Sequence, residues 1–364
     1  MKDIGIRSSA LLALGWSASW EHAFRSVVDD LSALEPGRVV ASSREQLRVV
    51  AGDGEEDAVI PGRLLFAADS ALELPCTGDW LALRRSAPGG PLLVERVVPR
   101  RTLLVRRAAG RSTAAQPLAA NVDVALLVAA LTGDFSPRRL ERWLALARDA
   151  GADPVVVLTK VDLCADPAPL LAAAQEVAAA APVLALDALG GTGVGALAEL
   201  LRPGTTVALL GSSGVGKSTL ANRLAGREVA ATSAIAADGR GRHTTTRREL
   251  LPLAGGAILL DTPGLREVGL WLGGQALAGL FPEIETAARS CRFRDCMHDL
   301  EPGCAVRAAI AAGDIDAARL ASLHKLRAEE GALARRTDEG AAREEKRRVR
   351  ALHRAARKHR PRWL

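Results

Sequence analysis

The chain has 364 residues, 48% of them hydrophobic and 25% charged, with a formal net charge of +6. This length and apolar content predict two to three domains with packed cores. Apolar runs such as residues 124–131 are too short to cross a bilayer, and the N-terminus lacks the pattern of a secretory signal. These features exclude a membrane-spanning protein, and we expect a cytoplasmic location with no membrane partner.

Short strands predominate in the first third of the chain. Residues 1–35 are interpreted as a partly helical extension, and residues 36–110 contain five β-type runs, at residues 38–41, 47–51, 63–66, 80–83 and 92–98. Because these runs follow one another without intervening helices, they predict a small barrel, and the oligonucleotide-binding (OB) type fits this length. Other small β-barrels fit equally well. Residues 109–117 are predicted to be a linker.

Residues 118–268 are predicted to form an α/β domain. Strands of the buried type alternate with helices there, which favours a mainly parallel sheet covered by helices on both faces. Residues 122–131 form the first apolar strand. Ser136 and Pro137 then supply an N-cap and a first helical residue for a helix that extends through Ala150.

The sequence TKVD, residues 159–162, follows a second strand of the buried type at residues 154–158. The Asp162 carboxylate can accept hydrogen bonds from N1–H and N2–H₂ of guanine, a donor pair that adenine lacks, so the motif favours GTP over ATP. Lys160 can lay its stem along the base. Thr159 stands where most GTPases have asparagine, so we expect weaker base binding with guanine preference retained. An exposed strand-end loop is the alternative.

A second strand-end segment resembles another guanine contact. Asp187-Ala188-Leu189 ends the apolar run at residues 183–186, and is similar to the Ser-Ala-Leu/Lys loop that presents a backbone amide to the guanine O6. Asp187 replaces the usual serine. The predicted base-binding residues are therefore Thr159, Lys160, Val161, Asp162, Asp187, Ala188 and Leu189.

The segment GSSGVGKST, residues 211–219, lies between an apolar run at 206–210 and helix-compatible residues 218–224. A strand, a glycine loop and a helix in this order predict a phosphate loop, because successive amides form an anion site at a helix N-terminus. Lys217 is predicted to reach the β- and γ-phosphates, and Ser218 to ligate Mg²⁺. The other predicted contacts are Gly211, Ser212, Ser213, Gly214, Val215, Gly216 and Thr219.

Lysine usage and motif order add to this interpretation. Only six of the 48 basic residues are lysine, yet Lys160 and Lys217 both lie inside the two motifs, where a compact ammonium suits the role. The base-reading motif precedes the phosphate loop, the reverse of the order in an ordinary small GTPase. The domain is therefore predicted to be circularly permuted.

A basic loop at residues 239–250 follows the phosphate loop. One of its threonines, for which we take Thr245, is placed to meet Mg²⁺ and the γ-phosphate, and His243 is the internal candidate for orienting water. A solvated basic turn and a surface histidine are the alternatives.

DTPG, residues 261–264, follows the apolar run at residues 257–260. Asp261 can hold the magnesium shell and the Gly264 amide can reach the γ-phosphate. Leu265 stands where Ras-like enzymes carry a water-orienting glutamine just beyond this glycine. We therefore expect slow hydrolysis by the protein alone and acceleration by a partner.

Cys291, Cys296, His298 and Cys304 follow the spacing C-x4-C-x-H-x5-C. Thiolate and imidazole ligands at short spacing suit tetrahedral Zn²⁺. Because protein supplies all four positions, none is left for a catalytic water, and one structural Zn²⁺ is predicted, without which the loop does not fold. Reduced core cysteines with a chance histidine are the alternative.

Helices are predicted around this cluster, within a zinc-binding domain at residues 269–338, at residues 276–288, 305–312 and 315–336. The chain ends in a basic tail, residues 339–364. Its last 24 residues carry ten Lys/Arg against two glutamates, a net charge of +8 that leaves −2 for the rest of the chain. This charge predicts contact with a polyanion, and a solvated helical tail is the alternative.

In this order the segments resemble one family, the circularly permuted, ribosome small-subunit-dependent GTPases. The resemblance covers residues 37–330, and its matching segments are NVD (121–123), DFSP (134–137), VLTKVDL (157–163), GSSGVGKSTL (211–220), GRGRHTTT (239–246), DTPG and the four zinc ligands. The departures are Thr159, Asp187 and the unmatched N-terminal extension. The two substitutions bear on nucleotide affinity.

The resemblance implies a multidomain α/β fold, with an OB-type barrel, a permuted GTPase domain and a helical zinc domain. It implies a late assembly factor of the 30S ribosomal subunit that hydrolyses GTP to GDP and phosphate with Mg²⁺, slowly alone and faster on the subunit. The barrel and zinc domain would bind 16S ribosomal RNA, and hydrolysis would release the factor. We expect a monomer.

Two other functions remain open at this point. One is an RNA-binding protein in which the nucleotide is a structural ligand with negligible turnover, an option that Leu265 keeps open. The other is a GTPase with a non-ribosomal target, such as a membrane or a metal-delivery partner. Turnover with and without 30S subunits tests the first, and co-sedimentation with 30S particles tests the second.

Overall fold

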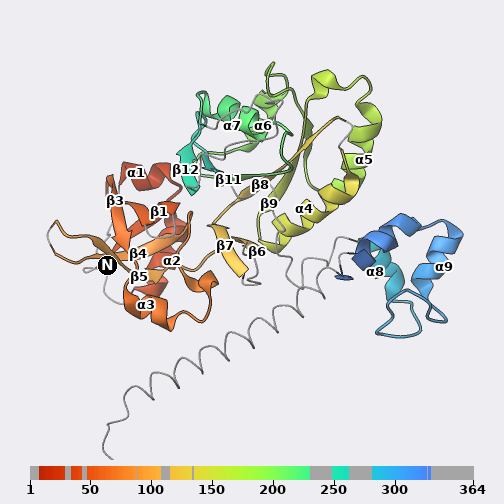
Figure 1. Cartoon of the computed structure of the whole chain (residues 1–364), viewed down its shortest axis with the longest axis horizontal. Coiled ribbons are helices and arrows are strands. Elements are labelled where there is room, and N and C mark those ends of the chain that lie inside the picture. The colour runs from red at the N-terminus through yellow and green to blue at the C-terminus, as the bar shows by residue number, and fades with distance from the viewer. Residues whose placement is uncertain are drawn as a thin grey trace, which may run out of the picture. The chain divides into compact units, whose positions relative to one another are not determined.

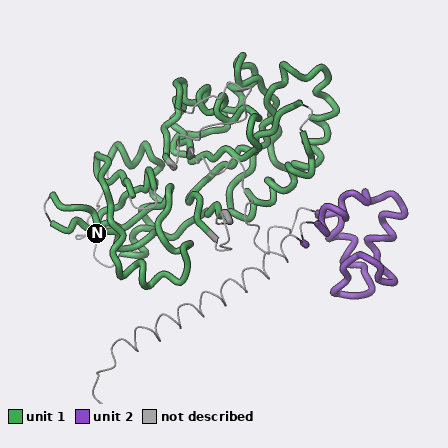
Figure 2. The backbone as a smooth tube through the Cα atoms, viewed as in Figure 1, with its two compact units in different colours: residues 1–106, 116–270 green, residues 107–115, 271–364 purple. Residues whose placement is uncertain are grey.

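The computed structural model describes residues 8–28, 34–42, 47–87, 89–107, 115–132, 135–229, 248–261, 281–325 and 327–328. The chain divides into two compact units, residues 1–106 with 116–270, and residues 107–115 with 271–364 (Figure 2). The finer division into five segments stays a prediction. Within the described parts of the chain, no helix is both long and apolar enough to cross a membrane.

The first unit begins with helices α1 (Ser9–Ala13) and α2 (Ala18–Val27), followed by a closed five-stranded barrel (Figure 1). Its strands are β1 (Glu35–Ser42), β2 (Leu47–Ala51), β3 (Gly54–Val59), β4 (Trp80–Arg85) and β5 (Leu92–Val97). They pair in the order β1-β2-β3-β5-β4, and β4 pairs again with β1 to close the barrel. The predicted OB-type barrel is confirmed. Its core contains Val39, Val49, Leu81, Leu83 and Val94.

Two predictions within the barrel were wrong. The run at residues 63–66, expected as a strand, lies in helix α3 (Gly62–Ala67), where Leu, Phe and Ala without β-branched neighbours favour a helix after Pro61. Strand β3 was missed because it carries three acidic residues, and only Ala58 in it is buried. A short 3₁₀ helix, η1 (Ala71–Glu73), follows α3.

The predicted linker at residues 109–117 is partly wrong as well. Strands β6 (Leu103–Arg107) and β7 (Ala115–Ala120) form a two-stranded sheet, so residues 115–117 belong to a strand. Pro117 and the lack of β-branched residues hid this strand in the sequence. Residues 109–114 lie outside the described residues.

The α/β part of the first unit contains a mainly parallel sheet in the order β10-β9-β8-β11-β13-β12. Its strands are β8 (Val124–Ala130), β9 (Asp153–Thr159), β10 (Val183–Ala185), β11 (Thr206–Leu210), β12 (Arg248–Pro252) and β13 (Ile258–Asp261). Only β12 is antiparallel to its neighbours there. Because the parallel strands run in one direction, the C-terminal ends of β8, β9 and β11 lie at the same edge of the sheet. The predicted TKVD motif and phosphate loop lie at this edge, at the ends of β9 and β11.

Helices cover both faces of this sheet, as predicted (Figure 1). Helices α4 (Pro137–Asp149) and α5 (Ala168–Ala178) pack together, and α6 (Val194–Leu200) packs with α7 (Lys217–Ala225). A 3₁₀ turn, η2 (Val161–Leu163), follows β9. The core contains aliphatic side chains of the strands and of α6 and α7, among them Leu126, Val128, Val157, Leu197, Val207, Leu220 and Leu259.

The barrel and the α/β sheet are continuous. Strand β1 pairs antiparallel with β12, with Ala41 opposite Glu249 and Ser42 opposite Arg248, so that one sheet of eleven strands runs through both. The buried Arg38 guanidinium reinforces this junction by donating to Thr206 Oγ1 at 2.7 Å, to the Gly78 carbonyl at 3.4 Å and to the Leu14 carbonyl.

The aromatic residues of the N-terminal extension pack at the same junction. The Trp16 ring lies 4.9 Å from the Trp80 ring and 6.0 Å from Phe24, and the Trp20 ring lies 6.0 Å from Trp80. The Arg101 guanidinium stacks 4.0 Å from the centroid of the Trp20 ring. The aromatic side chains of residues 8–28, a segment that no motif matches, are therefore part of the interior of the first unit.

The second unit contains helices α8 (Pro282–Ala288) and α9 (Ala305–Ala312), and residues 317–325 are helical as well. The predicted helix at residues 305–312 is confirmed with the same bounds, whereas residues 276–280 and 329–336 of the other two lie outside the described residues. The buried side chains of the second unit include Phe281, Ile284, Val306 and Leu323. The loop between α8 and α9 carries the predicted zinc ligands.

Candidate functional site

The phosphate loop joins β11 to α7, as its sequence setting predicts. Two glycines are required by geometry. A Cβ at Gly211 would lie 2.3 Å from the Val128 carbonyl oxygen, so only glycine fits where the loop leaves the sheet. Gly216, the residue before α7, has a φ of +93°, in the left-handed region that side chains avoid.

Lys217 is buried inside the loop. Its ammonium donates to the Gly211 carbonyl at 2.7 Å and to the Ser212 carbonyl. These bonds hold the ammonium within the curve of the loop. Ser218 and Thr219 follow on the first turn of α7, and both are half-buried.

The Thr159 side chain connects the TKVD segment to this loop. The Thr159 hydroxyl lies 2.6 Å from the Val215 carbonyl oxygen and 3.2 Å from that of Ala129, and the side chain is 1% exposed. Thr159, predicted to contact the nucleotide, thus faces backbone carbonyls of the phosphate loop and β8. The Thr159 hydroxyl thus connects the TKVD segment and the phosphate loop, which are far apart in the sequence.

The rest of TKVD lies toward the surface. Lys160 adopts a φ of +60°, which is uncommon outside glycine, and Asp162 is exposed in η2. Val161 between them is half-buried. Because Thr159 is fixed to the phosphate loop, Lys160 lies beside that loop and lines one pocket with Ser213 and Gly214.

The loop at residues 187–189 is held by its aspartate. Asp187 Oδ1 accepts a hydrogen bond from the Leu189 N–H at 2.8 Å, and the Asp187 N–H donates to the Thr192 carbonyl at 2.9 Å. Ala188 is buried and Leu189 is 77% exposed. The carboxylate does what a serine hydroxyl does in such turns, which explains how Asp187 replaces serine here.

A pocket of about 200 Å³ opens between the phosphate loop and α4. Its lining residues are Ala129, Ala130, Thr132, Ser136, Arg139, Trp143, Lys160, Ser212, Ser213, Gly214 and Val215. The sequence analysis missed Arg139 and Trp143. Their spacing from Ser136, three and seven residues along α4, places all three on one helical face, and this periodicity is the signal that could have found them.

Several predicted residues cannot be placed. Residues 239–247 of the predicted basic loop, with His243 and Thr245, lie outside the described residues, as do Gly264 and Leu265. Residues 248–250, expected in the same loop, instead begin strand β12. The backbone of Asp261 ends β13, which pairs with β11 in parallel, so this residue lies at the same sheet edge as the phosphate loop. Its side chain is also outside the described residues.

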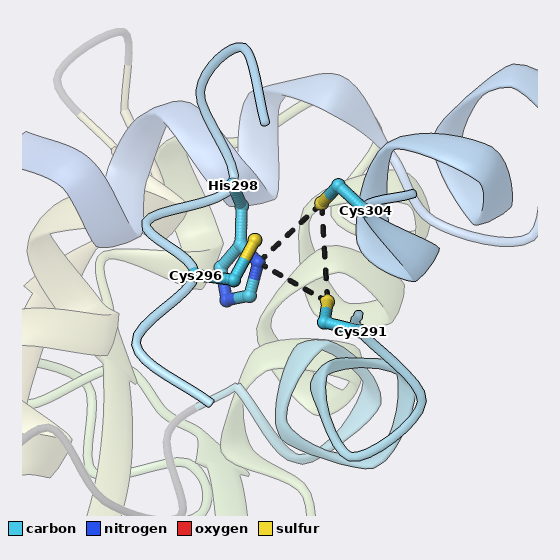
Figure 3. Close-up of side chains that lie close together, drawn as sticks. All are labelled: Cys291, Cys296, His298 and Cys304. Atoms are coloured by element: carbon cyan, nitrogen blue, oxygen red, sulfur yellow. Dashed lines mark hydrogen bonds between the residues drawn. The ribbon is translucent and has the colours of Figure 1, made fainter. Parts of the chain in front are cut away.

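The four predicted metal ligands converge in the second unit (Figure 3). His298 Nδ1 lies 3.7 Å from Cys291 Sγ and 3.5 Å from Cys304 Sγ, and those two sulfurs are 3.9 Å apart. All four ligand atoms, with Cys296, lie within 4.8 Å of one another. A tetrahedral Zn²⁺ keeps sulfur ligands about 3.8 Å apart and sulfur and nitrogen about 3.6 Å apart. The donor set therefore fits zinc.

Glu301, which the sequence analysis missed, shapes this loop. Its carboxylate accepts hydrogen bonds from the Met297 and Asp299 N–H groups, both at 2.8 Å, on either side of His298. His298 itself has a φ of +64°. The two bonds hold a backbone conformation that costs energy in a non-glycine residue, and so preset the direction of the imidazole.

The local environment also affects the ligands' protonation. Burial alone would raise the pKa of Cys291, but hydrogen bonds from the Val306 and Ala305 amides lower it overall. Desolvation raises the pKa of Cys296 to about 11, and burial lowers the pKa of His298. A neutral imidazole and one readily ionised thiol suit metal binding, which requires deprotonated ligands.

Comparison with known proteins adds the following relatives. A family model described as RsgA GTPase matches residues 97–271. The chain is 44% identical to the small ribosomal subunit biogenesis GTPase RsgA of Opitutus terrae, over 95% of this chain and 97% of that protein. It is 45% identical to the protein of that name from Streptomyces coelicolor, over 91% and 89%.

Two solved structures share the fold. YjeQ from Thermotoga maritima matches with a TM-score of 0.60 and 24% identity, over 82% of this chain and 98% of that one. YloQ, described as a circularly permuted GTPase, matches with a TM-score of 0.57 and 20% identity, over 84% and 97%. The predicted permuted fold is confirmed by this likeness and by the order of strands, in which β8 to β10 precede the phosphate-loop strand β11.

Proposed function

Because the chain belongs to the RsgA GTPase family, we propose that it is a GTP hydrolase of small ribosomal subunit biogenesis. It converts GTP and water to GDP and phosphate, and acts late in the assembly of the 30S subunit. The subunit accelerates hydrolysis, and hydrolysis releases the protein. The observation that carries the proposal is the bond from Thr159 to the Val215 carbonyl, since it joins base-reading and phosphate-binding loops into one guanine nucleotide site.

The nucleotide is assigned to residues of both loops. Lys217 contacts the β- and γ-phosphates, while Asp162 and the Ala188 amide read guanine. Asp187 already engages the Leu189 amide, which leaves the Ala188 amide as the donor to O6. Mg²⁺ would be held by Ser218, Thr245 and Asp261, where it neutralises charge on the phosphates.

One structural Zn²⁺ is proposed at the Cys₃His cluster. The fit of its sulfur and nitrogen spacings to tetrahedral coordination supports the proposal. Removal of the metal by a strong chelator should release one equivalent of zinc and abolish the helical signal of the second unit. Cys291→Ser should bind less zinc and reproduce this loss, whereas Cys164→Ser, outside the cluster, should not. A chain that keeps its zinc content after Cys291→Ser would contradict the assignment.

Contacts with 16S ribosomal RNA are proposed for the barrel, the zinc domain and the basic tail. The OB-type barrel supports this assignment, because such barrels commonly bind oligonucleotides. The last 24 residues of the tail, with their net charge of +8, would add binding that depends strongly on salt. We further propose that the protein acts as a monomer in the cytoplasm.

The test is GTP hydrolysis by the purified protein, titrated with 30S subunits, beside Lys217→Ala. We expect slow turnover alone, a saturable rise with 30S subunits, and none with the variant. Negligible turnover under both conditions would favour an RNA-binding protein with a structural nucleotide. Turnover that 30S subunits leave unchanged, without co-sedimentation, would favour a different target.

A further inference from the structure

A guanidinium lies at the phosphate-loop side of the pocket, on a helix outside the predicted motifs. Arg139 is in the first turn of α4, and its Nη1 donates to the Ser212 hydroxyl at 3.1 Å. The side chain is half-buried and lines the pocket together with Ser212, Ser213, Gly214 and Lys160. This contact joins residues 73 positions apart, so it depends on the folded sheet.

The position of this charge matters because of what the loop binds. Ser212 and Ser213 belong to the loop whose amides form the anion site, and Lys217 holds the Ser212 carbonyl. A guanidinium that reaches the Ser212 hydroxyl is therefore at the edge of that anion site. Its planar set of donors matches phosphate oxygens, and an arginine supplied in cis stabilises phosphoryl transfer in some GTPases.

We propose that Arg139 is a phosphate-binding arginine supplied in cis, whose guanidinium pairs with oxygens of the terminal phosphate of bound GTP. The inference rests on the proposed function and deepens it. In hydrolysis, the water oxygen forms a bond to the γ-phosphorus, and the bond from that phosphorus to the β–γ bridging oxygen breaks. The electron pair of the broken bond stays on GDP, and both protons of the water leave with the phosphate, as H₂PO₄⁻ or as HPO₄²⁻ and a proton released to solvent. Arg139 transfers no proton and neutralises charge.

The chain has a reason to need such a charge. Leu265 occupies the position of the water-orienting glutamine, so positioning of water is not supplied there. Arg139 stabilises the negative charge of the phosphate in the transition state, which lowers the barrier to hydrolysis whatever residue occupies position 265. It also distinguishes GTP from GDP, because GDP has no terminal phosphate for the guanidinium to meet.

A neighbouring arginine offers the matched control. Arg138 is on the same turn of α4 but is exposed, and it is not among the residues that line the pocket. Arg138→Gln and Arg139→Gln therefore remove the same charge from the same helix. Only the second removes it from the pocket.

The experiment compares affinities for fluorescent GDP and for a non-hydrolysable GTP analogue, followed by single-turnover hydrolysis with saturating 30S subunits. Arg139→Gln should lower affinity for the GTP analogue about tenfold more than affinity for GDP, and slow the single turnover by about 10³-fold or more. Arg139→Lys, which keeps the charge, should recover part of both losses. Arg138→Gln should match the wild type in both assays.

Ser212→Ala tests whether Arg139 binds the phosphate of the nucleotide or only anchors the phosphate loop through the Ser212 hydroxyl. If Arg139 acts on the nucleotide, Ser212→Ala should change GDP and GTP-analogue affinity by one common factor. If Ser212→Ala reproduces the Arg139→Gln profile, or if Arg139→Gln weakens both nucleotides equally, Arg139 is a structural anchor and the proposal is overturned. The ratio of the affinities for the GTP analogue and for GDP is measured without 30S subunits. A failure of the Arg139 proposal is therefore distinguishable from a failure of the proposed function, which is tested by Lys217→Ala and 30S-stimulated turnover.

Discussion

The proposed nucleotide site and the junction between barrel and sheet differ in how far apart in the sequence their contacting residues lie. In the phosphate loop, Lys217 binds carbonyl groups five and six residues away. At the junction, Arg38 binds a hydroxyl 168 residues away, as well as carbonyls of the extension and the barrel. A motif can encode the first kind of contact. The second kind depends on the whole fold of the first unit.

The two regions also use charge differently. Both side chains are buried and donate to backbone carbonyls, but we propose that Lys217 also contacts the phosphates of a nucleotide, whereas the contacts of Arg38 are with the protein's own groups. Burial lowers the pKa of Arg38 to about 10, although the nearby carboxylates of Asp123 and Asp79 oppose this shift. The guanidinium therefore stays charged at neutral pH and depends on its partners. Mutations at the junction should accordingly affect folding, and mutations in the pocket should affect nucleotide binding.

The largest effect is expected for Arg38→Met. Methionine fills much of the space but donates no hydrogen bond, so the Thr206, Gly78 and Leu14 acceptors lose a donor and nearby carboxylates lose a counter-charge. We expect the free energy of unfolding to fall by about 3–5 kcal/mol. Urea unfolding followed by tryptophan fluorescence measures it, because Trp16, Trp20 and Trp80 all pack at this junction.

Arg48→Met is the control for this experiment. The Arg48 ion pair with Glu55 is substantially exposed, and its loss should cost about 0–1 kcal/mol. Equal effects of the two substitutions would show that Arg38 is not what holds barrel and sheet together. Nucleotide affinity of the folded Arg38→Met protein should match the wild type, which keeps the two regions separate.

Gly78→Ala should have the next largest effect. Gly78 has a φ of +97°, and a Cβ there would lie 2.1 Å from the Ala120 carbonyl oxygen, where the barrel meets β7. Left-handed strain and a forced backbone shift together should cost about 3–4 kcal/mol in the same urea experiment. Gly52→Ala, at a φ of +55° with open space around it, should cost only the strain, about 1–2 kcal/mol. A Gly78→Ala protein no less stable than Gly52→Ala would refute the clash.

These contrasts explain what the sequence could predict. The phosphate loop and the Cys291/His298 cluster were predictable because short spacing and backbone geometry specify them, and apolar runs located most strands of the barrel and the sheet. Helix α3 was not, because a short apolar run does not by itself distinguish a helix from a strand. Strand β3 was not, because its acidic residues hide the apolar pattern of a strand. The partners of Arg38 and Arg139 were hidden for a further reason, since nothing in a linear motif indicates a contact 73 or 168 residues away.

Thr159→Val tests the hydrogen bond between the TKVD segment and the phosphate loop. Valine keeps the shape but removes the hydroxyl, which leaves the Val215 and Ala129 carbonyls without this donor. We expect about 1–2 kcal/mol of lost nucleotide affinity, or about tenfold in the dissociation constant of fluorescent GDP. Thr159→Ser retains the hydroxyl and should stay within about threefold of the wild type. Indistinguishable affinities for the two variants would mean that this bond does not join the loops functionally.

The smallest effect is expected at Asp187. Its carboxylate accepts from the Leu189 N–H at 2.8 Å, and a serine hydroxyl can accept the same bond, so Asp187→Ser should change GDP affinity by about twofold or less. Asp187→Ala removes the acceptor and frees the turn, at a cost of about 1 kcal/mol, or about fivefold in affinity. Fluorescent GDP titration of both variants measures the difference. If Asp187→Ser lost as much affinity as Asp187→Ala, nucleotide binding would require the negative charge at this position rather than the turn.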